Sequence, residues 1–384
     1  MIVSERQYDL ILYGATGFTG KQTVEYCRRF APPGLRWAIA GRNGDKLDAV
    51  NTARVDVIVA DARDSDALHR LAASTRVVAS TAGPFSIYGG KLVEACVRNR
   101  THYCDITGET PWIRGLIDRH HAQARADGTR IIPCCGFDSI PSDYGAWLVS
   151  RLVPDCQSVS AYFRMAGGLN GGTLATALHL SKTGELAATS DPFLLNPESH
   201  DVVDRARNAD PVGAHFDEEL KAWVTPFFMG PINTRIVRRT QALLGLRFDY
   251  QEYMRFESAA SARVVAAGSR VFESLLGSSF GRWLMQPLLP SPGEGPSEKT
   301  MDTGFFECLL IASGRSGNQV RFVVKGDGDP GNRITVKCLC ESAFVLAGVT
   351  DAPAGSGGVL TPVTGLGESL VDRLRHVRIV LERC

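Results

Sequence analysis

The sequence predicts an α/β fold in which a doubly wound parallel sheet is followed by a second α+β domain with a mixed or antiparallel sheet. Up to about residue 150, short runs that are apolar throughout alternate with segments of helical spacing. Continuously apolar strands are typical of a parallel sheet covered on both faces. A glycine-rich turn directly follows the first run, as in nucleotide-binding α/β sheets. Beyond residue 150, several segments alternate apolar and polar residues, which favours antiparallel strands.

Each element of the first domain has its own signal. The six apolar runs predict strands at 8–14, 36–41, 56–61, 77–83, 102–108 and 130–136. Segments with apolar residues at helical spacing predict helices at 21–30, 45–52, 64–74, 89–100 and 111–127. Because parallel strands need crossover connections, strands that alternate with helices describe one doubly wound sheet.

The second half of the chain has less regular spacing. It predicts strands at 159–165, 303–313, 319–326 and 333–341, helices at 171–182, 255–289 and 365–375, and an irregular stretch at 190–240. A length of 384 residues favours two domains. We place an NAD(P)-binding domain at 1–150, a substrate and dimerisation domain at 151–345, and at 346–384 a C-terminal segment that packs back on the first domain.

Composition narrows the class of protein. Lys and Arg number 42 against 41 Asp and Glu, so no net positive field would attract nucleic acid. None of the ten cysteines lies in a C-x-x-C pair, which argues against a metal site and for a reduced, intracellular protein. The chain lacks a run of about 18 apolar residues that could span a bilayer, and its first strand begins too early for a secretory leader. We therefore expect a cytoplasmic or peripherally membrane-associated protein.

The glycine-rich turn is the strongest functional signal. Gly14, Gly17 and Gly20 form a G-x-x-G-x-x-G pattern between the first strand and the first helix. Glycine permits a positive φ in the turn and lets the backbone approach a pyrophosphate, which binds the first amides of the helix. The sequence therefore predicts a Rossmann-type dinucleotide site. The site also includes the residues between the glycines, which are Ala15, Thr16, Phe18 and Thr19.

The end of the second strand indicates which dinucleotide binds. NAD-specific domains place a carboxylate there for the ribose hydroxyls, whereas this chain has Arg42. A guanidinium can pair with a 2′-phosphate, and Lys46 lies one helical turn further on, so we predict NADPH. Asp61, at the end of the third strand, either contacts the adenine or caps the next helix. The fourth strand is expected to pass the nicotinamide ribose with Ala82, Gly83 and Pro84.

A reductase also needs a source for the proton that accompanies the hydride. Tyr88 follows the nicotinamide strand, and Asp138 and Ser139 lie in the loop after the sixth strand. These three residues are the catalytic candidates, with His179 and water as further sources. Short-chain reductases instead use Tyr-x-x-x-Lys for proton transfer. None of the nine tyrosines is followed by lysine at that distance, which argues against that mechanism.

Three features of the later sequence admit two interpretations each. Asp143 is either part of the crevice or the cap of a helix at 144–152. Segment 256–290 mixes apolar and basic residues, so it either packs internally or on a second subunit, or lies in a membrane interface. A basic cluster either binds an anionic substrate group or forms a solvated face. This cluster consists of Arg235, Arg238 and Arg239.

Several motifs give the chain a family resemblance. They are LYGATGFTGK at 12–21, AGPFSIYG at 82–89, DITGE at 105–109, CGFDSIPSD at 135–143 and PFFMGPINTRIVRRT at 226–240. With these motifs the sequence resembles the saccharopine dehydrogenase-like oxidoreductases, and within them the trans-acting enoyl reductases. The resemblance implies NADP-linked reduction of an enoyl or carbonyl group in a lipid-type substrate. Two alternatives stay open, namely a saccharopine-type amino-acid dehydrogenase and a catalytically silent NADP(H)-binding protein on lipid surfaces.

Overall fold

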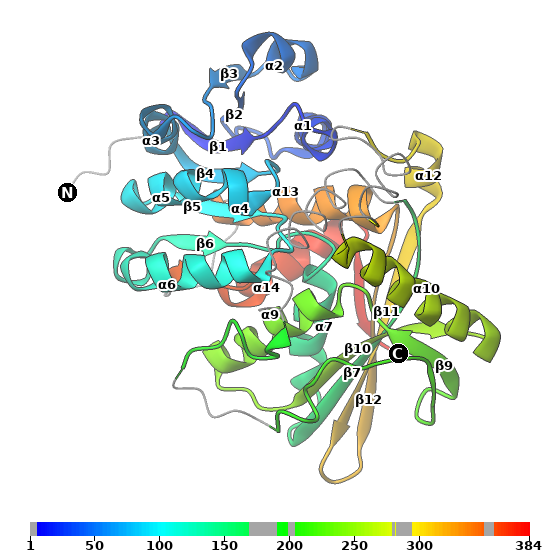
Figure 1. Ribbon diagram of the computed structural model, residues 1–384. Coiled ribbons are helices and arrows are strands. Elements are labelled where there is room, and N and C mark those ends of the chain that lie inside the picture. The colour runs from blue at the N-terminus through cyan, green and yellow to red at the C-terminus, as the bar shows by residue number, and fades with distance from the viewer. Residues whose placement is uncertain (1–5, 169–189, 199–203, 279–280, 282–293, 349–356) are drawn as a thin grey trace.

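Two seven-stranded sheets organise the chain (Figure 1). The computed structural model describes residues 6–168, 190–198, 204–278, 281, 294–348 and 357–384. In this part of the chain, no helix is both long enough and apolar enough to cross a membrane. The helix expected at 171–182 and the proton-donor candidate His179 lie outside the described residues.

The first sheet has the strand order of a doubly wound nucleotide-binding domain. Its strands run in the order β13-β6-β5-β4-β1-β2-β3, and all neighbouring strands are parallel. All six strands expected in the first domain are confirmed. Their bounds are β1 Tyr8–Tyr13, β2 Trp37–Gly41, β3 Asp56–Val59, β4 Thr75–Ser80, β5 His102–Asp105 and β6 Arg130–Ile132, and the late strand β13 Gly358–Val359 joins β6.

Helices cover both faces of this sheet, which explains why its strands are apolar throughout. Along β1, Leu10 and Leu12 face one hydrophobic cluster, and Ile11 and Tyr13 face the other. The second cluster is completed by α3 Ser65–Ser74, α5 Gly90–Arg98 and α6 Thr110–Asp127. The first is completed by α1 Phe18–Phe30, α13 Thr335–Leu346 and α14 Pro362–His376. Two short helices, α2 Gly44–Val50 and α4 Phe85–Tyr88, follow β2 and β4.

The second sheet is mixed. Its order is β14-β12-β11-β7-β10-β9-β8, with β7 and β10 parallel and the other neighbours antiparallel. Helix α7, Ile140–Ser150, packs against β7, β11 and β12. The strands are β7 Cys156–Ala166, β8 His215–Asp217, β9 Ala222–Pro226, β10 Asp249–Phe256, β11 Phe305–Gly314, β12 Gln319–Asp327 and β14 Val380–Arg383. The remaining helices are α9 Gly230–Leu244, α10 Ala259–Gly277, α12 Glu298–Thr303 and the π-helix η3 Pro330–Ile334.

The predicted fold class is confirmed, but two expectations for the second half are wrong. Residues 333–341, expected as a strand, belong to η3 and α13. The expectation failed because α13 is buried around nearly its whole circumference, so its sequence has no apolar stripe at helical spacing. The stretch at 190–240 contains β8, β9 and most of α9, and the polar side chains of α9 are buried rather than exposed. The C-terminal segment contributes one strand to each sheet. The domain bounds 1–150, 151–345 and 346–384 stay a prediction.

Asp143 is a buried junction between three helices. Helix α7 begins at Ile140 with Ser139 as N-cap, so the expectation that Asp143 caps it is wrong. The Asp143 carboxylate accepts hydrogen bonds from the Thr240 hydroxyl at 2.5 Å and from the Val363 amide at 3.0 Å. Burial raises the pKa of Asp143 to about 7. Asp143 therefore joins α7 to α9 and α14 through a carboxyl group that keeps its proton below about pH 7 in the folded protein.

This buried proton predicts a pH dependence of stability. An unfolded aspartate titrates near pH ~3.9. The stability that the bound proton contributes is therefore complete below that value and is lost as pH rises toward the folded pKa of about 7. Between pH ~4 and about 7, the unfolding free energy should fall less steeply with pH in Asp143→Asn than in the wild type, by about 1 kcal/mol per pH unit. Denaturant titrations at several pH values measure this slope. The exposed Asp66→Asn is the matched control, and equal slopes in both variants would contradict the assignment.

Candidate functional site

The three glycines of the predicted dinucleotide site have three different structural roles. Gly14 turns the chain at the end of β1 with a φ of 86°. A Cβ on Gly20 would lie 2.2 Å from the Gly14 carbonyl oxygen, so helix α1 packs on the strand without room for a side chain. Gly17 is the N-cap of α1, and a Cβ there would meet only the Gly14 carbonyl oxygen, at 3.5 Å. The position of Gly17 therefore leaves room for a ligand at the helix end.

This helix end fits a diphosphate. Helix α1 has 13 residues. No side chain caps its N-terminus by a hydrogen bond, and its first turn contains no acidic residue. The first amides of a helix lack intrahelical partners and carry the positive end of its dipole. Phe18 and Thr19 open this turn, and Ala15 and Thr16 complete the loop before it. The residues present therefore match the anion site that a dinucleotide needs.

The ends of β2 and β3 supply the charged groups for the ribose side. Arg42 and Lys46 are exposed, and the Lys46 amide donates to the Asn43 side chain that caps α2. Asp61 accepts from the Arg63 amide at 2.8 Å, and hydrogen bonds from Arg63 lower the pKa of that carboxyl. The helix-cap interpretation of Asp61 is wrong, since the cap of α3 is Asp64. Arg42 forms no hydrogen bond or ion pair within the described part of the chain, which leaves its guanidinium open to a phosphate.

The loop after β4 lies directly on the glycine turn. A Cβ on Gly14 would meet the Ala82 amide nitrogen at 2.9 Å, and the Thr81 hydroxyl donates to the Gly14 carbonyl at 3.2 Å. Gly83 and Pro84 continue this loop into the short helix α4. Its last residue, Tyr88, is 36% exposed. The loop for which nicotinamide contacts are predicted is thus in direct contact with the glycine turn.

Two buried carboxyl groups lie at the end of β5. Glu109 accepts from the amides of Phe85 at 2.7 Å and Ser86 at 2.9 Å. Asp105 accepts from the Thr107 amide at 2.9 Å, and burial raises its pKa to about 7. The sequence places both residues at a strand end, but no local pattern reveals their partners. Sequence reasoning therefore missed Glu109 as a functional candidate.

Asp138 and Ser139 are neighbours with different surroundings. Ser139 is fully buried, and its hydroxyl donates to the Asn233 side chain at 3.3 Å, which in turn donates to Glu252 at 3.0 Å. Asp138 is half-buried and forms no hydrogen bond with any residue that the structure describes. Burial raises its pKa to about 6. Of the two side chains, only that of Asp138 has no hydrogen-bond partner among the described residues.

The basic cluster on α9 is structural. Arg238 donates to the carbonyls of Pro192 at 3.0 Å and Tyr250 at 2.8 Å, and Arg239 donates to the Val359 carbonyl at 2.6 Å. Arg235 pairs with Asp210. All three guanidinium groups are buried, so the solvated-face interpretation is wrong. These contacts connect α9 to the segments around it and occupy the terminal guanidinium nitrogens that an anionic substrate would require.

Apolar side chains from the second half border the crevice. A Cβ on Gly108 would lie 2.9 Å from the Ile232 side chain at the start of α9, with Met229 at 3.9 Å. A Cβ on Gly295 would lie 2.4 Å from the Phe18 ring, so this later segment packs against the Phe18 side chain. Apolar side chains from the second half of the chain therefore lie beside the polar strand ends.

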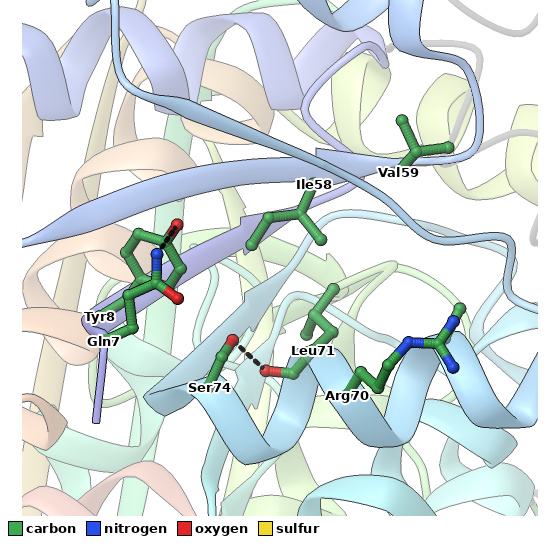
Figure 2. A pocket seen from close by; sticks show the side chains of 8 residues that line it. Gln7, Tyr8, Ile58, Val59, Arg70, Leu71 and Ser74 are labelled. Carbon is green, nitrogen blue, oxygen red and sulfur yellow. Dashed lines mark hydrogen bonds between the residues drawn. The ribbon is translucent and has the colours of Figure 1, made fainter. Parts of the chain in front are cut away.

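One surface hollow lies away from this crevice. Figure 2 shows it between the start of β1, the edge strand β3 and helix α3. None of the predicted site residues lines it. Its labelled residues are Gln7, Tyr8, Ile58, Val59, Arg70, Leu71 and Ser74. We therefore place the candidate site at the strand ends and not in this hollow.

Helix α10 covers the described part of the amphipathic segment 256–290. Its inner face includes Ala262, which is buried. Its outer face exposes 71% of Val264 and 59% of Val271. Arg263 and Arg270 are also exposed, and the Arg263 guanidinium lies 5.2 Å from the Trp223 ring centre. The helix therefore presents apolar and basic side chains outward, and the remainder of the segment lies largely outside the described residues.

Known proteins show what this chain is similar to. Residues 10–132 match the saccharopine dehydrogenase NADP-binding domain. A trans-acting enoyl reductase from Mycobacterium tuberculosis (strain H37Rv) is 34% identical, over 99% of each chain. The trans-acting enoyl reductase of Mycobacterium leprae is 32% identical, again over 99% of each. Among solved structures, saccharopine dehydrogenase from Saccharomyces cerevisiae has a TM-score of 0.56 at 12% identity, covering 98% of this chain and 99% of its own.

Proposed function

This chain belongs to the family of the trans-acting enoyl reductases and carries a saccharopine dehydrogenase NADP-binding domain, and from this premise we propose that it reduces the carbon–carbon double bond of a lipid-type enoyl thioester with NADPH. The observation that carries the proposal is the placement of three groups after the ends of parallel strands. An open helix N-terminus at Gly17, an uncommitted guanidinium at Arg42 and an uncommitted carboxyl group at Asp138 lie at the ends of β1, β2 and β6. Together they match a binding site for a diphosphate, a binding site for a 2′-phosphate and a proton donor.

The residues of the chain divide the reaction between binding and proton transfer. The first amides of α1 hold the diphosphate, Arg42 and Lys46 hold the 2′-phosphate, and the 82–84 loop borders the nicotinamide. NADPH, when bound, supplies a hydride for the β-carbon of the substrate. The double-bond electrons then move onto the thioester oxygen, and the α-carbon takes the proton from the Asp138 carboxyl group. Apolar residues such as Met229 and Ile232 exclude water from the acyl chain.

A direct assay tests this function. The purified protein is incubated with NADPH and trans-2-enoyl thioesters of increasing chain length, and NADPH oxidation is followed together with the mass of the product. We expect a saturated thioester two mass units heavier than the substrate, and faster turnover with NADPH than with NADH. Oxidation only with 3-keto thioesters, or only with an amino acid plus a keto acid, would favour carbonyl or saccharopine-type chemistry. Tight NADPH binding without turnover on any of these substrates would favour the catalytically silent alternative.

The role of Asp138 predicts a pH profile. With a pKa of about 6, this carboxyl group is mostly protonated below that value and loses its proton above it. If it donates the proton, kcat/KM falls as pH rises through about 6, and Asp138→Asn lowers kcat by about 10²–10⁴-fold and removes this pH dependence. Stopped-flow NADPH oxidation across the pH range measures both effects.

Two further variants separate Asp138 from the other candidates. Tyr88→Phe keeps the ring and removes only the hydroxyl, so unchanged turnover at saturating NADPH excludes Tyr88 as the donor. Ser139→Ala removes a buried hydroxyl that bonds to Asn233, and it should lower stability without changing the pH profile. A pH profile that moves with Tyr88 or Ser139 and not with Asp138 would overturn the assignment.

We further propose that the outward face of α10 contacts an anionic lipid surface. Val264 and Val271 are exposed although they are apolar, which is unusual for a helix face in contact with water. Arg263 and Arg270 are exposed on the same helix, and their positive charges complement lipid phosphates. A homodimer that buries the same face is the competing interpretation.

Liposome flotation separates these two occupants. We expect the protein to float with vesicles that contain phosphatidylglycerol and to float less as salt increases. Val264→Ser with Val271→Ser should lower the bound fraction severalfold, whereas Val59→Ser, at an equally exposed valine on β3, should not. Absence of flotation, combined with a dimer that the double substitution dissociates, would assign this face to a second copy of the chain.

A further inference from the structure

Glu109 is a fully buried carboxylate that connects two separate parts of the crevice. One oxygen accepts from the Phe85 amide at 2.7 Å, and the other accepts from the Ser86 amide at 2.9 Å. These are consecutive amides in the first turn of the short helix α4, and Glu109 itself immediately precedes the 18-residue helix α6. The long helix thus anchors a side chain that binds both free amides at the start of the short one.

The loop that Glu109 holds is also fixed at its two ends. At the start, Ala82 lies against Gly14 of the dinucleotide turn. At the end, a Cβ on Gly89 would lie 2.7 Å from the Trp112 ring, in the first turn of α6. Between these points a four-residue helix has few internal hydrogen bonds, so its position depends on partners outside itself. Among the residues that the structure describes, Glu109 is the side chain that accepts hydrogen bonds from the first amides of α4.

From this geometry we infer that Glu109 is a positioning residue for the 82–88 loop, which sets the distance between the nicotinamide end of the cofactor and the substrate. The inference rests on the proposed function. Two charge-assisted hydrogen bonds to consecutive amides fix both the position of α4 along its axis and its rotation about that axis. Small displacements of a group that borders the reacting atoms lower the rate strongly, even when the ligand still binds.

The chemistry of the carboxylate suggests a narrow substitution. Glu109→Gln keeps the size of the side chain, but its nitrogen cannot accept a hydrogen bond from an amide. One of the two amides therefore loses its partner and faces another donor in a buried site. Glu109→Asp keeps the charge on a shorter side chain and should be intermediate. Glu94→Gln is the matched control, because Glu94 lies exposed on the neighbouring α5 and pairs with Arg98.

Two nucleotides then report the position of the loop without any turnover. NADPH reaches the 82–88 loop through its nicotinamide and the ribose that carries it, whereas adenosine 2′,5′-bisphosphate keeps the 2′-phosphate and lacks both of these groups. In Glu109→Gln we expect the Kd of NADPH to rise about tenfold and the Kd of adenosine 2′,5′-bisphosphate to stay within about twofold. Isothermal titration gives both constants, and the fluorescence lifetime of bound NADPH reports the environment of its nicotinamide. With an enoyl thioester, kcat should fall by about tenfold or more.

The outcomes separate this inference from the proposed function. Equal rises in both dissociation constants, or no rise in either, would overturn the positioning role, and Glu109→Asp decides the case if the glutamine variant does not fold. A wild-type protein that binds both nucleotides but reduces no enoyl thioester would refute the proposed reaction and leave the role of Glu109 testable by the lifetime and the two affinities. A wild-type protein that binds neither nucleotide would refute both.

Discussion

Substitution of Gly20 by alanine is expected to destabilise the protein and to abolish NADPH binding, whereas the same substitution at Gly17 should weaken binding alone. The Cβ at position 20 would lie 2.2 Å from the Gly14 carbonyl oxygen and 2.8 Å from the Ala15 carbonyl carbon. Since these are backbone atoms, helix α1 must move away from the strand. Forced overpacking of this kind costs about 1–3 kcal/mol or more, and the displaced helix no longer presents its amides to the diphosphate.

Gly17→Ala tests the other half of this prediction. At this position the φ of −71° suits alanine, and the new Cβ would have only ordinary contact with Gly14. The protein should therefore keep its melting temperature within a few degrees. The methyl group lies where the pyrophosphate approaches most closely, so we expect the Kd of NADPH to rise by about tenfold or more.

Thermal unfolding and NADPH titration measure these effects side by side. Gly90→Ala is the control, because a Cβ at Gly90 would meet no atom within 4 Å. It should leave both quantities unchanged or raise stability slightly. If Gly17→Ala destabilised the fold as much as Gly20→Ala, the assignment of separate packing and binding roles to the two glycines would be wrong.

The first sheet could be predicted from the sequence because its signals are local. Each parallel strand is buried on both faces and is therefore apolar over its whole length, and each crossover helix follows within a few residues. The glycine turn is equally local, since Gly14, Gly17 and Gly20 act on their immediate neighbours. The family resemblance that these motifs carry is confirmed. The NADP cofactor follows from the same region of the chain.

The second half could not be predicted to the same extent, because its helices bury residues that sequence patterns assign to solvent or to strands. On α9, Arg238 and Arg239 are among the largest fully buried side chains, and carbonyl partners far away in sequence compensate for their burial. The residues of α13 are buried on nearly every side of the helix, so its sequence lacks the apolar stripe at helical spacing that would distinguish it from a strand. Burial of this kind depends on tertiary contacts that spacing does not encode.

A site residue can be predicted from the sequence where its residue type alone indicates its role. It cannot be predicted where its role depends on contact with a distant segment of the chain. Arg42 stands out because a carboxylate is expected at its position. Glu109 does not stand out, because its partners lie 23 and 24 residues earlier in the chain. The bond between Ser139 and Asn233 spans 94 residues. A carboxylate at the end of a strand is therefore a signal for a site, but its role becomes clear only once its partner is known.

Substitution of Arg42 by alanine is expected to remove the preference for NADPH over NADH. Arg42 is exposed at the end of β2, next to the open end of α1, and it forms no ion pair with the residues described here. Its guanidinium is therefore available for a bidentate bond to the 2′-phosphate, and a hydrogen bond to a charged group contributes about 1.5–3 kcal/mol. The Kd of NADPH should accordingly rise by about 10–150-fold, while the Kd of NADH stays the same.

Two neighbouring cations make the result specific. Lys46→Ala should have a smaller effect, because a lysine offers a single point charge where arginine offers a fork. Arg63→Ala should have little effect on either nucleotide, since Arg63 already pairs with Asp61. Fluorescence titrations at two salt concentrations measure all three variants, and the Arg42 contribution should fall with added salt. If Arg42→Ala weakened NADPH and NADH equally, the guanidinium would be supporting the fold of the β2 end and not selecting the phosphorylated ribose.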